Sequence, residues 1–132
     1  MPLVVSALYD LAQRENEPRR RSVQEYLTFG RLLFTTQNDL HVFCEPHLVG
    51  ELENYLLLRP EGYATSIEGL PFEDLPAWSL ARSAAVGLSN GSLVRTASTS
   101  NLVKDTPSAQ TVWWSKLGLM KMAAEQSRHG AS

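Results

Sequence analysis

Short apolar runs and amphipathic stretches alternate along the first half of the chain. The run Leu3–Leu8 is rich in β-branched and other apolar residues, and a second run covers residues 40–44. Both are typical of buried β-strands. The first run stops at the pair Tyr9-Asp10, and polar side chains between a strand and a helix line the ligand crevice of open α/β sheets. We therefore expect a ligand site at the carboxyl ends of these strands.

Two helices are expected between and after these runs. Ser22 and Glu25 have capping-box spacing, in which each side chain satisfies an exposed backbone N–H of the other residue. Apolar residues recur at helical spacing from there to Phe34. Pro46 suits the first turn of the second helix, which Pro60 ends. The order strand, helix, strand, helix predicts an α/β fold with a short parallel sheet.

The second half of the chain has fewer periodic segments. Residues 60–76 are rich in Pro, Gly and Glu, and the stretch 63–67 is compatible with a short third strand. Apolar residues then recur at the spacing of a small helix that begins near Pro76. Residues 89–109 show little periodicity, which predicts a long loop.

A final helix is expected from residue 109 to residue 126, with a frayed tail at residues 127–132. On a helical wheel, Lys116 falls inside the apolar arc of this helix. A buried ammonium without a partner is unfavourable, so its head either reaches water or meets an anion such as Asp10 or a ligand phosphate. This broad apolar arc consists of one stripe, Trp113, Leu117, Met120 and Ala124, with Val112, Leu119 and Ala123 on its flank.

Composition describes a globular chain that we treat as one domain, residues 1–132. It is 43% hydrophobic and 20% charged, with a net charge of −2, which gives no indication of nucleic acid or of an anionic membrane as partner. Cys44 is the only cysteine, so a reducing compartment, the cytoplasm, is expected. No apolar stretch approaches the roughly 18 residues of a membrane helix, and no basic segment of a leader precedes the first strand.

Three segments, taken in order, carry a family resemblance. The first is Val4 to Leu11, followed by arginines and Tyr26-Leu27; the second is the run at residues 40–44. The third is the stretch 101–107, followed by an aromatic pair, Ser115-Lys116 and a leucine-rich segment. Together they resemble the HtrL/YibB family of bacterial proteins, and the match covers most of the chain.

The resemblance implies a glycosyltransferase-like domain, a partial Rossmann-like or GT-A-like three-layer fold. In this family a strand with a Trp-x-Asp-Ala-Gly block, the counterpart of a metal-binding acidic motif, normally follows the Ser-Lys helix. The sequence reaches Ser132 without such a block. We therefore expect either the amino-terminal part of the fold or a truncated relative without catalysis. Mn²⁺ or Mg²⁺ would belong to the complete family fold, and no metal ligands are assigned in this chain.

The candidate substrate-binding residues lie near the first strand and on the final helix. Tyr9 is expected to contact the base or ribose of a nucleotide sugar, and Asp10 to accept hydrogen bonds from it. Arg14 or Lys116 would neutralise phosphate, and Arg20 lies just before a helix N-terminus that favours anions. The complete set is Tyr9, Asp10, Arg14, Arg20, Ser115 and Lys116.

These observations leave two functional classes open. The first is a domain that binds a nucleotide-sugar donor and is incomplete for catalysis. The alternative is a non-catalytic binding or protein-interaction domain, a degenerate fragment. A sheet of two or three strands leaves an unpaired edge and an apolar face, so self-association is also expected.

Overall fold

The computed structural model describes residues 2–15, 22–92 and 107–130. Within these residues, three strands and five α-helices follow one another as β1 (Leu3–Leu8), α1 (Leu11–Glu15), α2 (Val23–Gly30), β2 (Asp39–Cys44), α3 (Val49–Glu53), β3 (Thr65–Gly69), α4 (Trp78–Asn90) and α5 (Pro107–Gly130). Short 3-10 turns lie between them, namely η1 (Arg31–Thr35), η2 (Pro46–Leu48), η3 (Leu56–Leu58) and η4 (Phe72–Asp74).

The strands form one parallel sheet in the order β1-β2-β3. Leu8 at the end of β1 is opposite Cys44 at the end of β2, and Cys44 is opposite Gly69 at the end of β3. The predicted α/β fold with a short parallel sheet is therefore confirmed, and β1 has the predicted bounds. Because the three strands end in register, the segments that follow them meet at one edge of the sheet.

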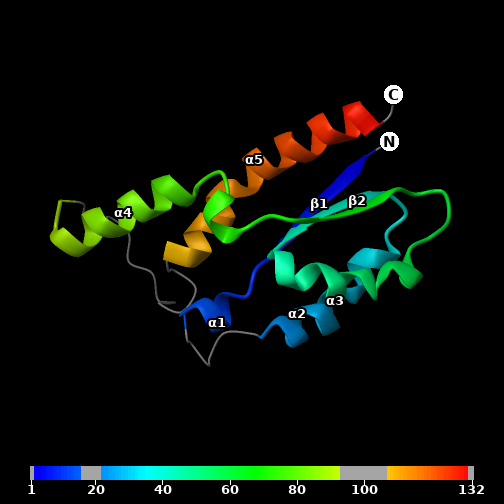
Figure 1. Cartoon of the computed structure of the whole chain (residues 1–132), viewed down its shortest axis with the longest axis horizontal. Helices are drawn as coiled ribbons and strands as arrows, with labels where there is room; N and C mark the ends of the chain where they lie inside the picture. Colours follow the sequence, from blue (N-terminus) through cyan, green and yellow to red (C-terminus); the bar gives the residue numbers. More distant parts are fainter. Residues whose placement is uncertain (1, 16–21, 93–106, 131–132) are drawn as a thin grey trace.

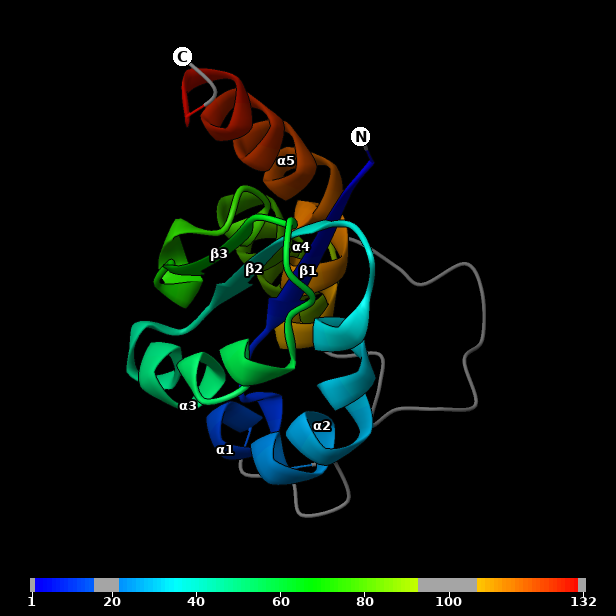
Figure 2. The same cartoon turned by 90° about the vertical axis from the view of Figure 1, so that its right-hand side faces the viewer.

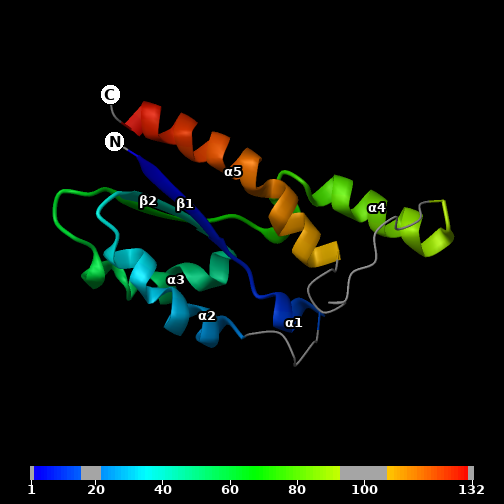
Figure 3. The same cartoon turned by 180° about the vertical axis from the view of Figure 1, so that it is seen from behind.

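Helices cover both faces of the sheet, as Figures 1 and 2 show. On one face, α2 and α3 pack over alternate strand residues, and the core there comprises Val23, Leu27, Phe34, Leu40, Val42, Cys44, Leu48 and Leu52. On the other face lies α5, with α4 beside it (Figure 3). The second core comprises Tyr9, Phe43, Phe72, Leu75, Leu119 and Ala123.

The helix after Ser22 begins as its sequence predicts. The Ser22 backbone N–H donates to the Glu25 carboxylate at 3.3 Å, and the Glu25 N–H donates to the Ser22 hydroxyl at 3.2 Å. Both bonds of the capping box are therefore present. The α-helix is shorter than its apolar pattern, because it ends at Gly30 and continues as η1. Phe34 on η1 still reaches the core, with 4% of its surface exposed.

The final helix turns a different face to the sheet from the one predicted. Its buried residues are Ala109, Thr111, Ser115, Leu119 and Ala123, while Trp113, Leu117 and Met120 are 66%, 80% and 53% exposed. Of the predicted apolar arc, the flank residues Leu119 and Ala123 are buried, whereas the stripe that contains Trp113, Leu117 and Met120 is largely exposed. Small side chains face inward because the helix approaches its neighbours closely: a Cβ at Gly118 would lie 2.7 Å from the ring of Pro76.

Two segment predictions also change. Helix α5 continues to Gly130, so most of the expected frayed tail is helical, since backbone hydrogen bonding continues past residue 126. The expected loop at 89–109 gives its first residues to α4 and its last to α5, while residues 93–106 lie outside the described residues. Within the described residues, no helix has the length and apolar character needed to cross a membrane.

Candidate functional site

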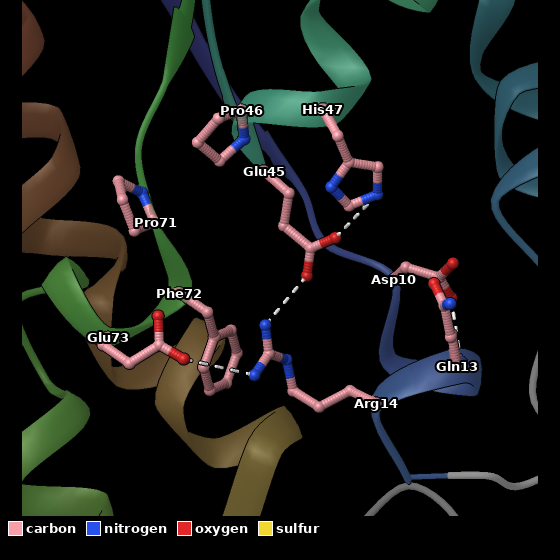
Figure 4. Close-up of a pocket in the computed structure, with 9 residues that line it drawn as sticks. All are labelled: Asp10, Gln13, Arg14, Glu45, Pro46, His47, Pro71, Phe72 and Glu73. Atoms are coloured by element: carbon pink, nitrogen blue, oxygen red, sulfur yellow. Dashed lines mark hydrogen bonds and ion pairs between the residues drawn. The ribbon is translucent and has the colours of Figure 1, made fainter.

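A cavity of about 430 Å³ opens at the carboxyl edge of the sheet. Each strand contributes residues from the segment that follows it: Asp10, Gln13 and Arg14 after β1, Glu45, Pro46 and His47 after β2, and Pro71, Phe72 and Glu73 after β3 (Figure 4). The predicted location of a site, beyond the carboxyl ends of β1 and β2, therefore holds a cavity of ligand size.

Arg14 belongs to the segment after β1 and reaches across this cavity to the segments after β2 and β3 (Figure 4). It lies on α1, and its Nη2 is 3.2 Å from Oε1 of Glu45. Its Nη1 is 3.5 Å from Oε1 of Glu73. The carbon at the centre of the guanidinium lies 3.9 Å from the centroid of the Phe72 ring, a cation–π contact. The arginine is therefore held by two charges and one aromatic face.

Glu45 is the most buried charged group of the cavity. Only 7% of its side chain is exposed, against 32% for Arg14 and 56% for Glu73. Its second oxygen lies 3.5 Å from Nε2 of the exposed His47. A buried carboxylate needs partners of opposite charge or hydrogen-bond donors, and Arg14 and His47 provide them.

Tyr9 and Asp10 have structural partners at this edge. Tyr9 is 4% exposed, and its hydroxyl donates to the Leu70 carbonyl at 2.8 Å. Burial raises the pKa of this phenol well above its usual value, with Cys44 and Glu45 adding to the effect, so the hydroxyl remains a donor. Asp10 accepts a 2.9 Å hydrogen bond from the Gln13 backbone N–H and caps α1. Asp10 lines the cavity, whereas Tyr9 lies beneath it in the core.

Two further candidates, Ser115 and Lys116, do not line this cavity. Ser115 is fully buried, accepts a 3.0 Å hydrogen bond from the Ala77 N–H and donates to the Thr111 carbonyl at 2.6 Å. Lys116 is exposed, with its ammonium 5.6 Å from the centroid of the Trp113 ring. It lines a separate cavity of about 250 Å³ beside β1. Arg20 lies outside the described residues.

The sequence prediction missed seven of the nine described residues that line the cavity, among them Glu45, His47, Phe72 and Glu73. For Glu45 and His47 a signal was present, since they directly follow the second predicted strand as Asp10 follows the first. The third strand was expected at 63–67 but lies at Thr65–Gly69. Phe72 and Glu73 could be assigned to the carboxyl end of this strand only if its last residue was known, and the sequence did not define that residue.

The cavity is acidic and offers no metal site. Three carboxyl groups, those of Asp10, Glu45 and Glu73, line it together with one guanidinium, which contacts Glu45 and Glu73. Across the described residues, no group of three or more His, Cys, Asp or Glu side chains is placed to hold a metal ion. The described residues therefore provide no set of ligands for the divalent ion that the family resemblance implies. Carboxylates and an arginine are suited to hydroxyl and anion recognition.

Comparisons of the chain with known protein families, with characterised proteins and with solved structures found no match.

Proposed function

We propose that this chain is the donor-binding part of a glycosyltransferase-like domain and binds a nucleotide sugar in the cavity at the carboxyl edge of the sheet. The observation that carries the proposal is the position of Arg14, which crosses a cavity formed by the segments after all three parallel strands. Ligands of open α/β sheets bind at this edge, and arginine pairs with phosphate through two parallel hydrogen bonds. The Rossmann-like and GT-A-like architecture is part of this proposal.

The remaining residues of the cavity support a hydroxyl-rich ligand. Asp10 and Glu45 are carboxylates and accept hydrogen bonds from hydroxyl groups of ribose or sugar. Phe72 is buried, and its ring supports the guanidinium of Arg14 from one side. Tyr9 was expected to contact the base or ribose. In this proposal it stabilises the fold beneath the cavity instead, because its hydroxyl donates to the Leu70 carbonyl.

We propose binding without sugar transfer. Among the described residues nothing holds the divalent ion that commonly stabilises the leaving diphosphate in GT-A-type transfer. We also propose the cytoplasm as the compartment, on the basis of the single cysteine.

Ligand titration of the purified chain tests this function. UDP-, GDP- and CDP-sugars are titrated calorimetrically with and without Mn²⁺, against the wild type, Arg14→Gln and the matched control Arg31→Gln. Arg31 is exposed and does not line the cavity. We expect one nucleotide class to bind the wild type and Arg31→Gln alike, and to bind Arg14→Gln at least ten-fold more weakly, the equivalent of about 1.4 kcal/mol. Absence of binding by all three classes would refute the proposal.

The interaction-domain alternative rests on the exposed apolar stripe of α5. Trp113, Leu117 and Met120 are largely exposed, and they lie on the helix that covers β1, an edge strand of the described sheet. Under this alternative, we propose that a second copy of the chain covers the stripe. Light scattering after size exclusion checks this: the wild type should be a dimer and Leu117→Lys a monomer. A wild-type monomer at all concentrations would argue against this alternative.

A further inference from the structure

The guanidinium that the proposed function assigns to phosphate already has two carboxylate partners. Nη2 of Arg14 faces Glu45 at 3.2 Å and Nη1 faces Glu73 at 3.5 Å. A ligand phosphate is also an anion whose oxygens accept hydrogen bonds from a guanidinium, as carboxylate oxygens do. A phosphate that binds at Nη1 or Nη2 competes with the carboxylate already there, so its affinity depends on how firmly each carboxylate is held.

The two carboxylates are held very differently. The Glu45 side chain is 7% exposed and has His47 as a second partner, so exposing or rearranging it would leave a buried charge without compensation. The Glu73 side chain is 56% exposed, and Arg14 is the only ion-pair partner that the structure gives it among the described residues. Water can solvate Glu73 as soon as it leaves the arginine. Glu73 is therefore the carboxylate that yields.

Arg14 stays in place when Glu73 leaves. Glu45 still binds Nη2, and the ring of Phe72 still covers one face of the guanidinium. The Nη1 edge then faces the cavity with its orientation already fixed. A phosphate would meet a preorganised donor, so binding requires little further ordering of the arginine.

We propose that Glu73 is a specificity-determining residue that competes with the phosphate of the ligand for Nη1 of Arg14, while Glu45 remains the permanent partner of Nη2. Glu73 thus lowers the affinity of the cavity for phosphate-bearing ligands and leaves its affinity for the phosphate-free part of the same ligand unchanged. This inference rests on the proposed function, since it takes Arg14 as the phosphate-binding residue.

The test compares Glu73→Gln with the matched variant Asp74→Asn. Both substitutions remove one negative charge from η4, and Asp74 is exposed and does not line the cavity. UDP, GDP and CDP are titrated in 150 mM NaCl, where the Debye length is about 8 Å and distant charges are screened. Uridine, guanosine and cytidine serve as phosphate-free probes.

We expect Glu73→Gln to bind the diphosphate about two- to five-fold more tightly than the wild type, the range for loss of one exposed ion pair. The affinity for the nucleoside, and both affinities of Asp74→Asn, should equal those of the wild type. If the wild type binds a diphosphate and Glu73→Gln binds it no more tightly, the inference is overturned and the proposed function stands. An equal gain for nucleoside and diphosphate also overturns it. If no variant binds any diphosphate, the proposed function and the inference fall together.

Discussion

Substitution of Ser115 tests whether this residue binds a ligand or stabilises the fold. Its hydroxyl accepts a hydrogen bond from the Ala77 N–H at 3.0 Å, and both residues are buried, with 0% and 6% of their surfaces exposed. Substitution Ser115→Ala removes the acceptor and leaves that N–H buried without a partner. A buried unsatisfied donor costs about 1–3 kcal/mol of folding free energy. The free energy of unfolding should fall by this amount.

Urea denaturation followed by tryptophan fluorescence measures this change. With a slope of roughly 1–3 kcal/mol per molar urea for small proteins, a loss of about 2 kcal/mol moves the midpoint by about 1 M. Ser79→Ala is the control, since Ser79 is exposed on α4 and surface changes stay within about 0.5 kcal/mol. An unchanged midpoint together with lost nucleotide-sugar binding would refute the structural role and restore the ligand role.

Three further outcomes are expected. Gly118→Ala should cost about 1–3 kcal/mol of folding free energy through overpacking, from which a helix-propensity gain of about 1 kcal/mol is subtracted. Gly50→Ala on α3 should stabilise the protein by up to that gain, because nothing lies within 4 Å of its added Cβ. Burial lowers the pKa of His41 below its ordinary value of 6.5, against the opposing effect of Glu68. Below pH 6.5 the unfolded chain therefore binds more protons than the folded chain, and the free energy of unfolding decreases as the pH is lowered. The urea midpoint of His41→Gln should decrease less than that of the wild type over the same pH range. Burial and the nearby carboxylate of residue 45 raise the pKa of the fully buried Cys44 thiol to about 11, so thiol reagents should modify it only after unfolding.

Each of these expectations has an outcome that contradicts it. Equal stability of the two glycine variants would show that α5 can move away from its neighbour at no cost. An identical pH dependence of wild type and His41→Gln would remove His41 as the cause. Rapid modification of Cys44 in native buffer, matched by no loss of structure in circular dichroism, would place the thiol nearer the surface.

The strands and the capped helix were predictable because local pattern decides them. Leu3–Leu8 is apolar except for Ser6, as expected for a strand with helices on both of its faces, and Ser22 and Glu25 need only each other to begin α2. The position of the cavity at the carboxyl ends of the strands was predictable from the parallel strand order. Asp10 and Arg14 line this cavity, and their role in ligand binding stays a prediction.

The orientation of α5 was not predictable, because tertiary packing overrides the apolar pattern. A hydrophobic wheel favours Trp113 and Leu117 for the interior, but the inward face of α5 carries Leu119 with the small side chains of Ser115 and Ala123. Ser115 was a candidate ligand contact as part of the Ser-Lys pair of the family resemblance, and its hydroxyl has two partners within the fold. The partners of Arg14 were equally hidden, since they lie 31 and 59 residues away along the chain.

Those separations have a consequence for how the molecule assembles. The contacts of Arg14 join residues 31 and 59 positions apart, so each closes a long loop, and such contacts form slowly because loop entropy opposes them. The guanidinium acquires its complete surroundings only after β3 has joined the sheet. Nucleotide binding during refolding would accordingly appear in the last kinetic phase, and a nascent chain would gain it only after residue 73 has left the ribosome.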